Sequence, residues 1–332
     1  MALKICVIGC GSHSSKVHGP SLRKYASEYP DTVLAACCDL DPEKAAKYKE
    51  AFGFERCYTD MYKMLETEKP DAVCVIVPER FICDTACTVM GLGFHVMLEK
   101  PPGLNPAENL RLINAAEKSG VINQVAFNRR SMPLINRLKE QIDEYASGTV
   151  QSLFYEFYRY NRKEPTFETT AIHGIDTARH IIGSDYKSVR FTYREMPELG
   201  SKVANIFMDC EFESGVYARL NFCPCTGVVL ERFTVNALND TFFLTTPIWD
   251  GFDTPGELTH VKAGKLVSRV SGLDVTLSQA MFETNGFYYE DRAFFENVRA
   301  GRKSKNDIRS TLQSVELEEA IEKRIAYWEK KA

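Results

Sequence analysis

The 332-residue sequence lacks several features that would place a protein in a particular class at once. It has no apolar run of roughly 18 residues that could span a bilayer, and it opens on a strand-like segment in place of a basic, apolar leader. Its 41 basic and 45 acidic residues are mixed along the chain and give a net charge of -4, so no basic stripe is present for binding nucleic acid. We therefore expect a soluble, cytoplasmic protein with no membrane or nucleic-acid partner.

Metal-binding cysteine patterns are also missing, although the chain contains 11 cysteines. No two cysteines form a C-x-x-C pair, and no histidine cluster completes a tetrahedral zinc site. Several cysteines, such as Cys6, Cys37 and Cys74, lie in apolar, strand-like segments, where a thiol acts as a small hydrophobic group. The sequence predicts buried free thiols in a reducing compartment and no metal site.

The chain is longer than one hydrophobic core usually serves, and the pattern of apolar residues in its first region differs from that in the rest. Short apolar runs without polar alternation are separated by helical segments, a pattern typical of a parallel sheet covered by helices. The expected strands are Leu3–Ile8, Thr32–Cys38, 72–77 and 95–98, and the expected helices include Pro42–Phe52 and 60–66. We expect residues 1–126 to form an α/β domain with a parallel sheet.

The second region, residues 127–332, is rich in strand-like segments with little helix between most of them. These segments are 153–160, 188–193, Ala204–Phe212, 216–222, 233–238 and 241–245. Successive strands without crossover helices favour an antiparallel sheet, whereas helical periodicity returns over 289–328, with Asp307 as the expected N-cap of the last helix. We expect an α+β domain with a large, mostly antiparallel open sheet that binds substrate and forms a homodimer or homotetramer.

A glycine-rich turn, Gly9-Cys10-Gly11-Ser12-His13-Ser14, follows the first expected strand. It is a G-x-G-x-x-S version of the dinucleotide-binding fingerprint, placed after a strand and before a helix as that fingerprint requires. Gly9 allows the tight turn and Gly11 lets the backbone approach a pyrophosphate, which would sit at the helix N-terminus. Ser14 departs from the usual third glycine, and a generic glycine turn is the alternative. The turn favours a Rossmann-type domain.

Two acidic residues follow the second expected strand and are suited to different tasks. Asp41 precedes Pro42, which fits the first position of a helix, so Asp41 is the expected N-cap. Asp39 is then left to accept hydrogen bonds from the adenosine ribose, and its charge would repel a 2′-phosphate. The sequence therefore favours NAD over NADP as cofactor, the alternative being that Asp39 only caps a loop.

The triplet Glu99-Lys100-Pro101 follows another buried strand, about ninety residues after the glycine turn. It resembles the signature of the Gfo/Idh/MocA oxidoreductases, named after glucose-fructose oxidoreductase, inositol dehydrogenase and rhizopine catabolism. Further segments resemble that family in the same order along nearly the whole chain: 71–73 with Val77-Pro78, 127–130, 172–176 and 286–294. The resemblance implies an NAD(P)-dependent dehydrogenase or reductase that acts on a CH–OH group of a sugar, glycoside or polyol.

The resemblance also implies roles for residues around the triplet. Lys100 would act catalytically in a cleft beside the nicotinamide, because a cation next to the substrate oxygen stabilises a developing alkoxide. Glu99 would orient the nicotinamide end of the cofactor. The alternative is that Lys100 is an ordinary surface lysine near a turn. The expected cofactor-binding set is Gly9, Gly11, Ser12, His13, Ser14, Asp39, Val77, Pro78, Glu99, Lys100 and Asn128.

A helical segment in the second region carries His173, Asp176 and His180 at spacings of three and four, which places them on one face. His173 is expected to relay the substrate proton and Asp176 to orient it, whereas His180 more simply packs in the core. Inositol-dehydrogenase-like members commonly place an aspartate four residues before this histidine, where this chain has Thr169. The expected catalytic set is Lys100, His173 and Asp176, and the substrate-binding set is Lys100, Arg129, Tyr160, Arg162, Thr169 and His173.

Two other functions remain open at this point. A glycoside-cleaving enzyme of the same fold would oxidise a ring hydroxyl transiently with retained NAD, eliminate the aglycone and return the hydride. A regulator would bind the dinucleotide as a signal and catalyse nothing. Lys100 and His173 argue against the regulator, and net NADH production would separate the other two.

Overall fold

The computed structural model describes residues 2–146 and 148–331. The chain forms two compact units, each built from two segments. Unit 1 comprises Met1–Asn128 and Gly286–Val315, and unit 2 comprises Arg129–Asn285 and Glu316–Ala332.

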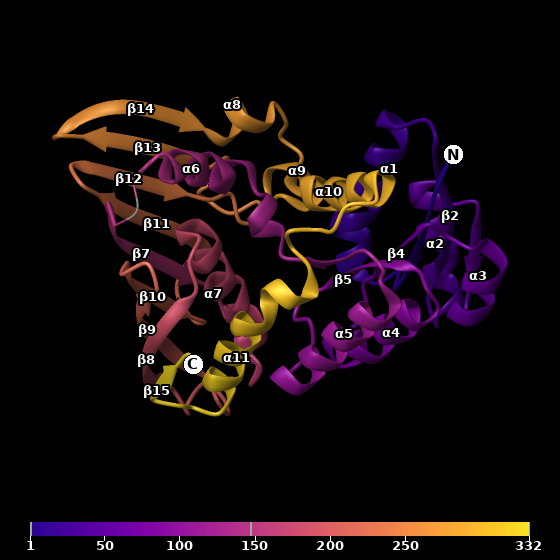
Figure 1. The fold of residues 1–332 in the computed structure, drawn as a ribbon, viewed down its shortest axis with the longest axis horizontal. Helices are drawn as coiled ribbons and strands as arrows, with labels where there is room; N and C mark the ends of the chain where they lie inside the picture. The colour runs from indigo at the N-terminus through magenta and orange to yellow at the C-terminus, as the bar shows by residue number, and fades with distance from the viewer. Residues whose placement is uncertain (1, 147, 332) are drawn as a thin grey trace. The chain divides into compact units, whose positions relative to one another are not determined.

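Unit 1 contains a six-stranded sheet in the order β3-β2-β1-β4-β5-β6, with all neighbouring strands parallel (Figure 1). Its strands are β1 Leu3–Ile8, β2 Thr32–Cys38, β3 Arg56–Tyr58, β4 Ala72–Val75, β5 His95–Glu99 and β6 Asn123–Ala126. Nearly every residue of β1, β4 and β5 is buried, because helices cover both faces of the sheet. The strand order reverses between β1 and β4, so the carboxyl ends of these strands form the topological switch point of a Rossmann-type sheet.

The helices of unit 1 lie on both sides of this sheet. They are η1 Ser14–His18, α1 Gly19–Glu28, α2 Pro42–Phe52, α3 Met61–Glu68, α4 Glu79–Gly91, α5 Pro106–Ser119, α10 Phe287–Ala300, η3 Ile308–Thr311 and the start of α11 Leu312–Glu322. Asp41 caps α2 by accepting hydrogen bonds from the backbone N–H groups of Glu43 and Lys44, as predicted. Asp41 at the N-terminus of α2 and the left-handed Gly53 at its C-terminus explain why the bounds of this helix could be predicted from the sequence.

The segment Gly286–Val315 lies within unit 1, whereas the expected second domain included everything after residue 126. Helix α10 packs against α1, β5 and β6. An ion pair and a hydrogen bond also hold it there, since Arg299 donates to Asp31 at 2.6 Å and Tyr29 donates to Glu296 at 2.9 Å. The difference arises because helical periodicity shows that a segment is amphipathic but not which distant sheet it covers.

Unit 2 is built on a nine-stranded sheet in the order β14-β13-β12-β11-β7-β10-β9-β8-β15. Its strands are β7 Val150–Tyr158, β8 Tyr186–Glu195, β9 Ala204–Phe212, β10 Tyr217–Cys223, β11 Leu230–Ala237, β12 Asp240–Thr245, β13 Glu257–Lys262, β14 Lys265–Ser271 and β15 Tyr327–Glu329. All pairings are antiparallel except that of β7 with β10. The predicted fold class, a Rossmann domain followed by an α+β domain with a mostly antiparallel sheet, is confirmed.

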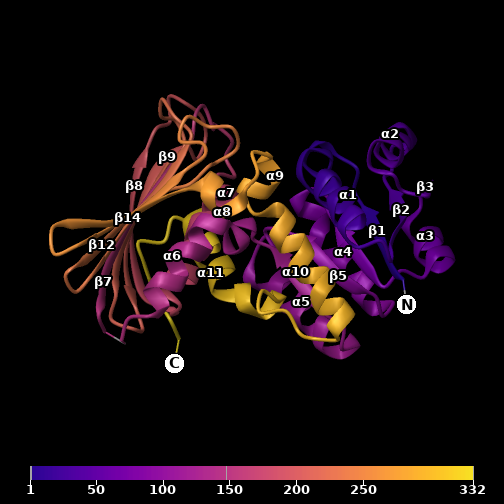
Figure 2. The same ribbon diagram turned by 90° about the horizontal axis from the view of Figure 1, so that it is seen from above.

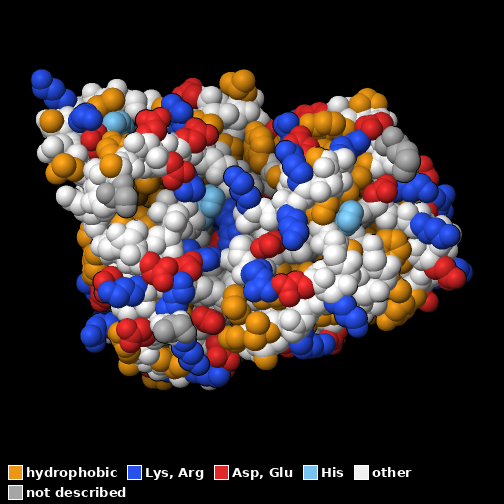
Figure 3. Space-filling model, in the orientation of Figure 1, with side chains coloured by type: hydrophobic (Ala, Val, Ile, Leu, Met, Phe, Trp, Pro, Cys, Tyr) orange, Lys and Arg blue, Asp and Glu red, His pale blue; other side chains and the backbone are white. Residues whose placement is uncertain are grey.

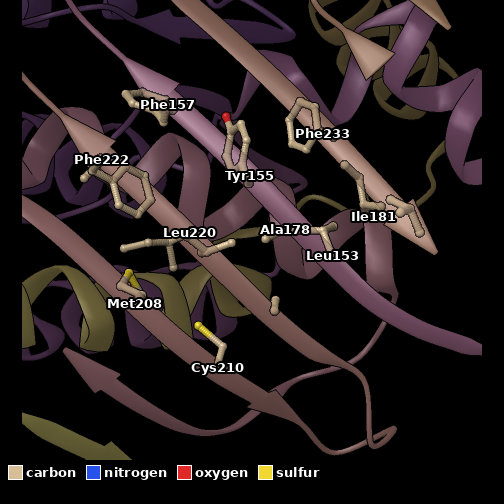
Figure 4. Close-up of a cluster of buried hydrophobic side chains, with 14 of the residues drawn as sticks. Leu153, Tyr155, Phe157, Ala178, Ile181, Met208, Cys210, Leu220, Phe222 and Phe233 are labelled. Atoms are coloured by element: carbon tan, nitrogen blue, oxygen red, sulfur yellow. The ribbon is translucent and has the colours of Figure 1, made fainter. Parts of the chain in front are cut away.

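Helices cover one face of the unit 2 sheet, as Figure 2 shows for α6 Pro133–Asp143, α7 Glu168–Ile182 and α11. Two short helices, α8 Gly272–Thr276 and α9 Met281–Thr284, complete this unit, and η2 Asn128–Ser131 lies at the first crossover. Alternate residues of the strands point into the core beneath these helices, including Leu153, Tyr155 and Phe157 of β7 (Figure 4). Helix α7 approaches the sheet closely at Gly174, where an added Cβ would lie 2.5 Å from Phe222.

The C-terminal prediction is partly wrong and partly confirmed. Residues Tyr327–Glu329 form β15 and pair with β8, although we expected helix as far as residue 328. Edge pairing with a distant strand overrides the local periodicity there. Asp307 does cap the helical segment that leads into α11, since its side chain accepts from the backbone N–H of Ser310.

Surface and cysteine predictions can be compared with the described residues. All 11 cysteines are free thiols, and Cys6, Cys37 and Cys74 are buried as predicted. Across residues 2–146 and 148–331, each helix is too short or too polar to cross a bilayer. Lys and Arg side chains are interspersed with Asp and Glu on the face drawn in Figure 3.

His180, on α7, is expected to make the stability of the fold sensitive to acid. Burial and the nearby Arg130 guanidinium lower the pKa of its imidazole to about 4. As pH falls below the ordinary histidine pKa, the unfolded chain binds a proton that the folded chain resists, so stability decreases. We predict that His180→Leu will be more stable than the wild type by up to about 2 kcal/mol at about pH 5 and will lose this advantage at about pH 8.

Urea unfolding at the two pH values measures this difference. A gain in the variant that is equal at both pH values would show that packing, and not protonation, sets the cost of His180.

Candidate functional site

The glycine turn after β1 adopts the geometry that the dinucleotide fingerprint requires. Gly9 has φ of 101°, and an added Cβ would lie 2.0 Å from the carbonyl oxygen of Ile76, so only glycine fits. An added Cβ at Gly11 would instead meet no atom within 4 Å. The backbone at Gly11 is therefore open to close approach by a ligand, as binding of a pyrophosphate demands.

The serine in the third position of the fingerprint is buried and is held by a hydrogen bond. Ser14 donates to the hydroxyl of Tyr48 at 3.0 Å, which satisfies its polar atom within the contact between the first two helices. The following residues, Ser14–His18, form a π-helical turn before α1. Pro20 explains why the chain departs from α-helical geometry here, since proline has no N–H to donate to the preceding turn.

The carboxylate of Asp39 lies at the end of β2 beside the glycine turn. It accepts one hydrogen bond from the backbone N–H of Cys10 at 2.8 Å and another from Asp41 at 3.0 Å. Asp39 is thus already engaged, but each carboxylate oxygen retains a second lone pair that could accept from a ribose hydroxyl. The two bonds fix its position next to the turn.

The candidate cofactor residues of unit 1 all follow the carboxyl ends of parallel strands. The glycine turn follows β1, Asp39 follows β2, Val77 and Pro78 follow β4, and Asn128 follows β6. Lys100 follows β5 and is half-buried, and its peptide bond to Pro101 is cis. Because carboxyl ends of parallel strands share one edge of the sheet, these residues lie along the edge where ligands bind in Rossmann folds.

A buried chain of charged side chains at the end of β5 was missed by the sequence analysis. His18 donates or accepts through Nε2 at 2.9 Å from Oε1 of Glu99, and its Nδ1 lies 3.0 Å from Oδ1 of Asp291. His13 also contacts Oε1 of Glu99, at 3.0 Å. Burial alone would raise the pKa of Glu99, but the two histidines hold it well below its usual range.

The spacing of these histidines explains why they were missed. His13 and His18 are five residues apart, which puts them on different faces of an α-helix. The i to i+5 geometry of the π-turn brings both to the same carboxylate. Asp291 comes from α10, a segment that the sequence did not assign to this unit.

Two groups within the described residues have ligand atoms close enough to hold a metal ion, although no metal site was predicted. One is His13, His18 and Glu99, and the other is His18, Glu290 and Asp291. Both rings of the first group are within hydrogen-bond distance of Glu99, so a proton can take the place of a metal between these atoms.

Helix α7 of unit 2 carries His173, Asp176 and His180, as the spacing predicted. His173 is half-buried, whereas Asp176 is only 1% exposed. Arg130 binds Asp176 through two parallel hydrogen bonds, of 2.7 and 2.5 Å. Both oxygens of Asp176 therefore accept hydrogen bonds from Arg130. The expected role of Asp176 in orienting His173 stays a prediction.

The expected substrate residue Arg129 is buried and pairs inside unit 2. Its guanidinium donates to Glu231 at 2.8 and 2.5 Å, and Arg159 and Tyr155 donate to the same carboxylate. Burial would raise the pKa of Glu231, but the two arginines lower it to about 2. Arg129 and Arg159 are thus both bound to one internal carboxylate of unit 2, and the expected contact of Arg129 with substrate stays a prediction.

The remaining substrate candidates of unit 2 are more accessible. Tyr160, just after β7, is 66% exposed. Arg162 donates to Glu164 at 2.6 Å and to Thr170 at 3.0 Å. The Thr169 hydroxyl donates to the carbonyl of Thr166 at 2.9 Å, in the first turn region of α7. The chain thus has a hydroxyl, and not a carboxylate, four residues before His173.

The first part of the chain resembles a known family. Residues 3–127 match the model of the oxidoreductase family with an NAD-binding Rossmann fold. Through these residues, the chain is similar to the Gfo/Idh/MocA oxidoreductases. Unit 1 is thus an NAD-binding Rossmann domain, and the open backbone at Gly11 and the acid at Asp39 fit that cofactor.

Individual relatives add to this result. The D-glucoside 3-dehydrogenase of Escherichia coli strain K12 is 30% identical over 148 residues, or 45% of this chain and 41% of that protein. The myo-inositol 2-dehydrogenase of Thermotoga maritima is 28% identical over 200 residues, or 56% of this chain and 57% of that protein. The matched part thus spans about half the length of these relatives.

The fold resembles solved structures over nearly its full length. A levoglucosan dehydrogenase solved in complex with NADH superposes with a TM-score of 0.84 at 18% identity, covering 99% of each chain. At this identity the likeness concerns the fold alone.

Asp39 and its neighbour Leu40, which is 91% exposed, generate a prediction on cofactor choice. In the double variant Asp39→Ser, Leu40→Arg, the charge that repels a 2′-phosphate is removed and a cation is added. We predict that the ratio of the Kd values for NADP and NAD falls by about tenfold or more, an effect of about 1.4 kcal/mol, measured by calorimetry.

Leu40→Arg alone is the matched control, and it should change the ratio less because Asp39 remains. Wild-type protein that binds NADP as tightly as NAD would contradict the role of Asp39.

Proposed function

We propose that the protein is an NAD-dependent dehydrogenase that transfers a hydride between nicotinamide and a hydroxyl or ketone of a sugar, glycoside or polyol. The observation that carries this proposal is the alignment of the glycine turn, Asp39 and Lys100 along one edge of the unit 1 sheet. The names of the relatives, a D-glucoside 3-dehydrogenase and a myo-inositol 2-dehydrogenase, support the substrate class. The net charge and mixed surface are consistent with the expected cytoplasmic location.

Lys100 is the residue that we assign to the reacting oxygen. Removal of a hydride from a carbinol requires loss of the hydroxyl proton, and an ammonium group stabilises the oxygen as that proton leaves. When NAD is bound, it supplies the hydride acceptor. Glu99 supports this step by accepting a hydrogen bond from the backbone N–H of Lys100 at 3.0 Å, which fixes the backbone at Lys100.

His173 is the residue that we assign to proton transfer. A neutral imidazole can accept the hydroxyl proton and release it to solvent, and His173 is half-buried and on the rigid helix α7. Arg130 pairs with Asp176 one turn further along and can hold that part of the helix in place. Tyr160, Arg162 and Thr169 are proposed to contact substrate hydroxyls, with Arg162 positioned by Glu164 and Thr170.

An absorbance assay tests the proposed function. The wild-type protein, incubated with NAD and a panel of sugars, glycosides and polyols, should produce NADH in proportion to product for at least one substrate. Release of an aglycone without net NADH would favour the glycoside-cleaving alternative. Absence of both across a broad panel, with NAD binding intact, would favour the regulator.

The lysine gives a sharper prediction. Lys100→Met should bind NAD nearly as the wild type does but lower kcat by roughly a hundredfold or more, because one charge-stabilising group is lost. His173→Ala should also lower kcat while leaving NAD affinity in place.

Lys118→Met, at an exposed lysine on α5, is the matched control and should retain wild-type rates. Turnover of Lys100→Met at the control rate would remove Lys100 from the mechanism.

The open face of the unit 2 sheet supports the further proposal of a homodimer or homotetramer. Phe154, Tyr217 and Phe243 are each more than 40% exposed on strands of this sheet. Exposed aromatic side chains on neighbouring strands are typical of surfaces that pair with another chain. Light scattering of the purified protein measures the assembly directly.

A further inference from the structure

Next to the proposed catalytic lysine, Glu99 continues into a buried chain of side chains, Asp291–His18–Glu99, and His18 and Asp291 have no part in the function described so far. We propose that His18 and Asp291 are positioning residues: His18 carries a proton on both ring nitrogens and links Asp291 to Glu99, which in turn fixes Lys100. This inference rests on the proposed function, because positioning of Lys100 matters only if that residue acts on substrate.

When both carboxylates are ionised, the hydrogen-bond geometry requires a doubly protonated ring. Nδ1 of His18 lies 3.0 and 3.2 Å from the two oxygens of Asp291, and Nε2 lies 2.9 Å from Glu99. Ionised carboxylates only accept hydrogen bonds, so each ring nitrogen must donate. A metal would need a lone pair on one of these nitrogens and would break one of the two bonds.

The environment of His18 favours the charged ring. Burial opposes the charge, but Asp291 and Glu99 raise the pKa of His18 well above its ordinary value. His18, Asp291 and Glu99 are 0%, 0% and 7% exposed, so water does little to weaken their attraction. The other titratable groups facing this cluster are His13 from the glycine turn, Glu290 from α10, Tyr48 from α2 and Cys74 from β4.

Glu99 links His18 to Lys100 because its two carboxylate oxygens bind different partners. Oε1 contacts His13 and His18, and Oε2 accepts the backbone N–H of Lys100 at 3.0 Å. A carboxylate satisfies all three donors at once. A glutamine in its place would direct its NH₂ group at either the histidines or the Lys100 N–H, so one set of bonds would be lost.

The need to attach α10 to the rest of unit 1 does not explain why Asp291, His18 and Glu99 are charged and buried. More accessible pairs, Arg299 with Asp31 and Tyr29 with Glu296, already join α10 to the first strands and helices. Burying charges carries a desolvation cost that a hydrophobic contact would avoid. The three buried charges are therefore better explained by the fixed position that they give to the end of β5.

The variant Asp291→Asn tests the chain through its pH dependence. Without the second carboxylate, His18 should lose its extra proton at lower pH, and the neutral ring can no longer donate to both neighbours. We expect kcat at about pH 6 to be near that of the wild type and to fall by about tenfold or more towards about pH 9, with the Kd for NAD changed less than about threefold. Asp291→Glu should restore the wild-type profile, and Glu99→Gln should lower kcat at every pH.

Asp31→Asn is the matched control, because it removes another carboxylate that binds α10. It should change stability without changing kcat or the pH profile. If Asp291→Asn keeps the wild-type kcat and profile, or Asp31→Asn reproduces its loss, the positioning role is overturned.

Nuclear magnetic resonance gives a readout that does not depend on turnover. The chain has six histidines, so a sample labelled with ¹⁵N-histidine gives a simple spectrum. His18 should keep two protonated nitrogens well above the pH at which an ordinary histidine titrates in the wild type, and should lose one of them at a lower pH in Asp291→Asn. Amide exchange at Lys100 should be slow in the wild type and faster in Glu99→Gln and Asp291→Asn.

These measurements separate failure of this inference from failure of the proposed function. A neutral His18 at about pH 8, zinc binding that displaces its protons, or a Lys100 amide that exchanges equally in all variants would overturn the inference even if the protein is a dehydrogenase. A doubly protonated His18 with a protected Lys100 amide, in a protein that oxidises no sugar, would support the chain and reject the dehydrogenase.

Discussion

The close contact between Gly9 and the chain after β4 is the constraint on which the rest of unit 1 depends. The backbone N–H of Ile76 donates to Ile8 at 2.8 Å, and the Ile76 carbonyl lies where a side chain at residue 9 would have to be. This contact forces the chain to turn sharply at the end of β1, at the point where the strand order reverses. The open backbone at Gly11 and the position of Asp39 both follow from that turn, since Cys10 is bound to Asp39.

Buried ion pairs recur next to the residues that we assign to chemistry. Glu99 is held by two histidines, Asp176 by Arg130, and Glu231 by Arg129 and Arg159. Such pairs add little net stability compared with well-packed apolar side chains, but loss of one partner costs about 3–5 kcal/mol because a buried charge is left alone. Their effect is to make a single arrangement much more favourable than its alternatives, which is what a site with fixed geometry needs.

The sequence predicted those parts of the fold that depend on local patterns. The bounds of β1 and α2 are as expected, because buried runs and an Asp-Pro cap are visible within a few residues. It failed where distant segments decide the outcome, as at β15, which pairs with β8, and at Gly286–Val315, which packs in unit 1. For the site, the glycine turn was recognisable from its spacing, whereas His18 required knowledge of a π-turn and of a partner 273 residues away.

Thr169 stands where inositol-dehydrogenase-like proteins commonly have an aspartate, and the contacts of α7 show what the two residues flanking His173 do in this chain. Thr169 uses its hydroxyl locally on the Thr166 carbonyl, and the acid one turn beyond His173 is already bound to Arg130. Thr169 and Asp176, which lie four residues before and three residues after His173 on α7, are therefore each bound to a group other than the imidazole. The pairing of Asp176 with Arg130 thus fixes the turn of α7 that follows His173, the residue that we propose for proton transfer.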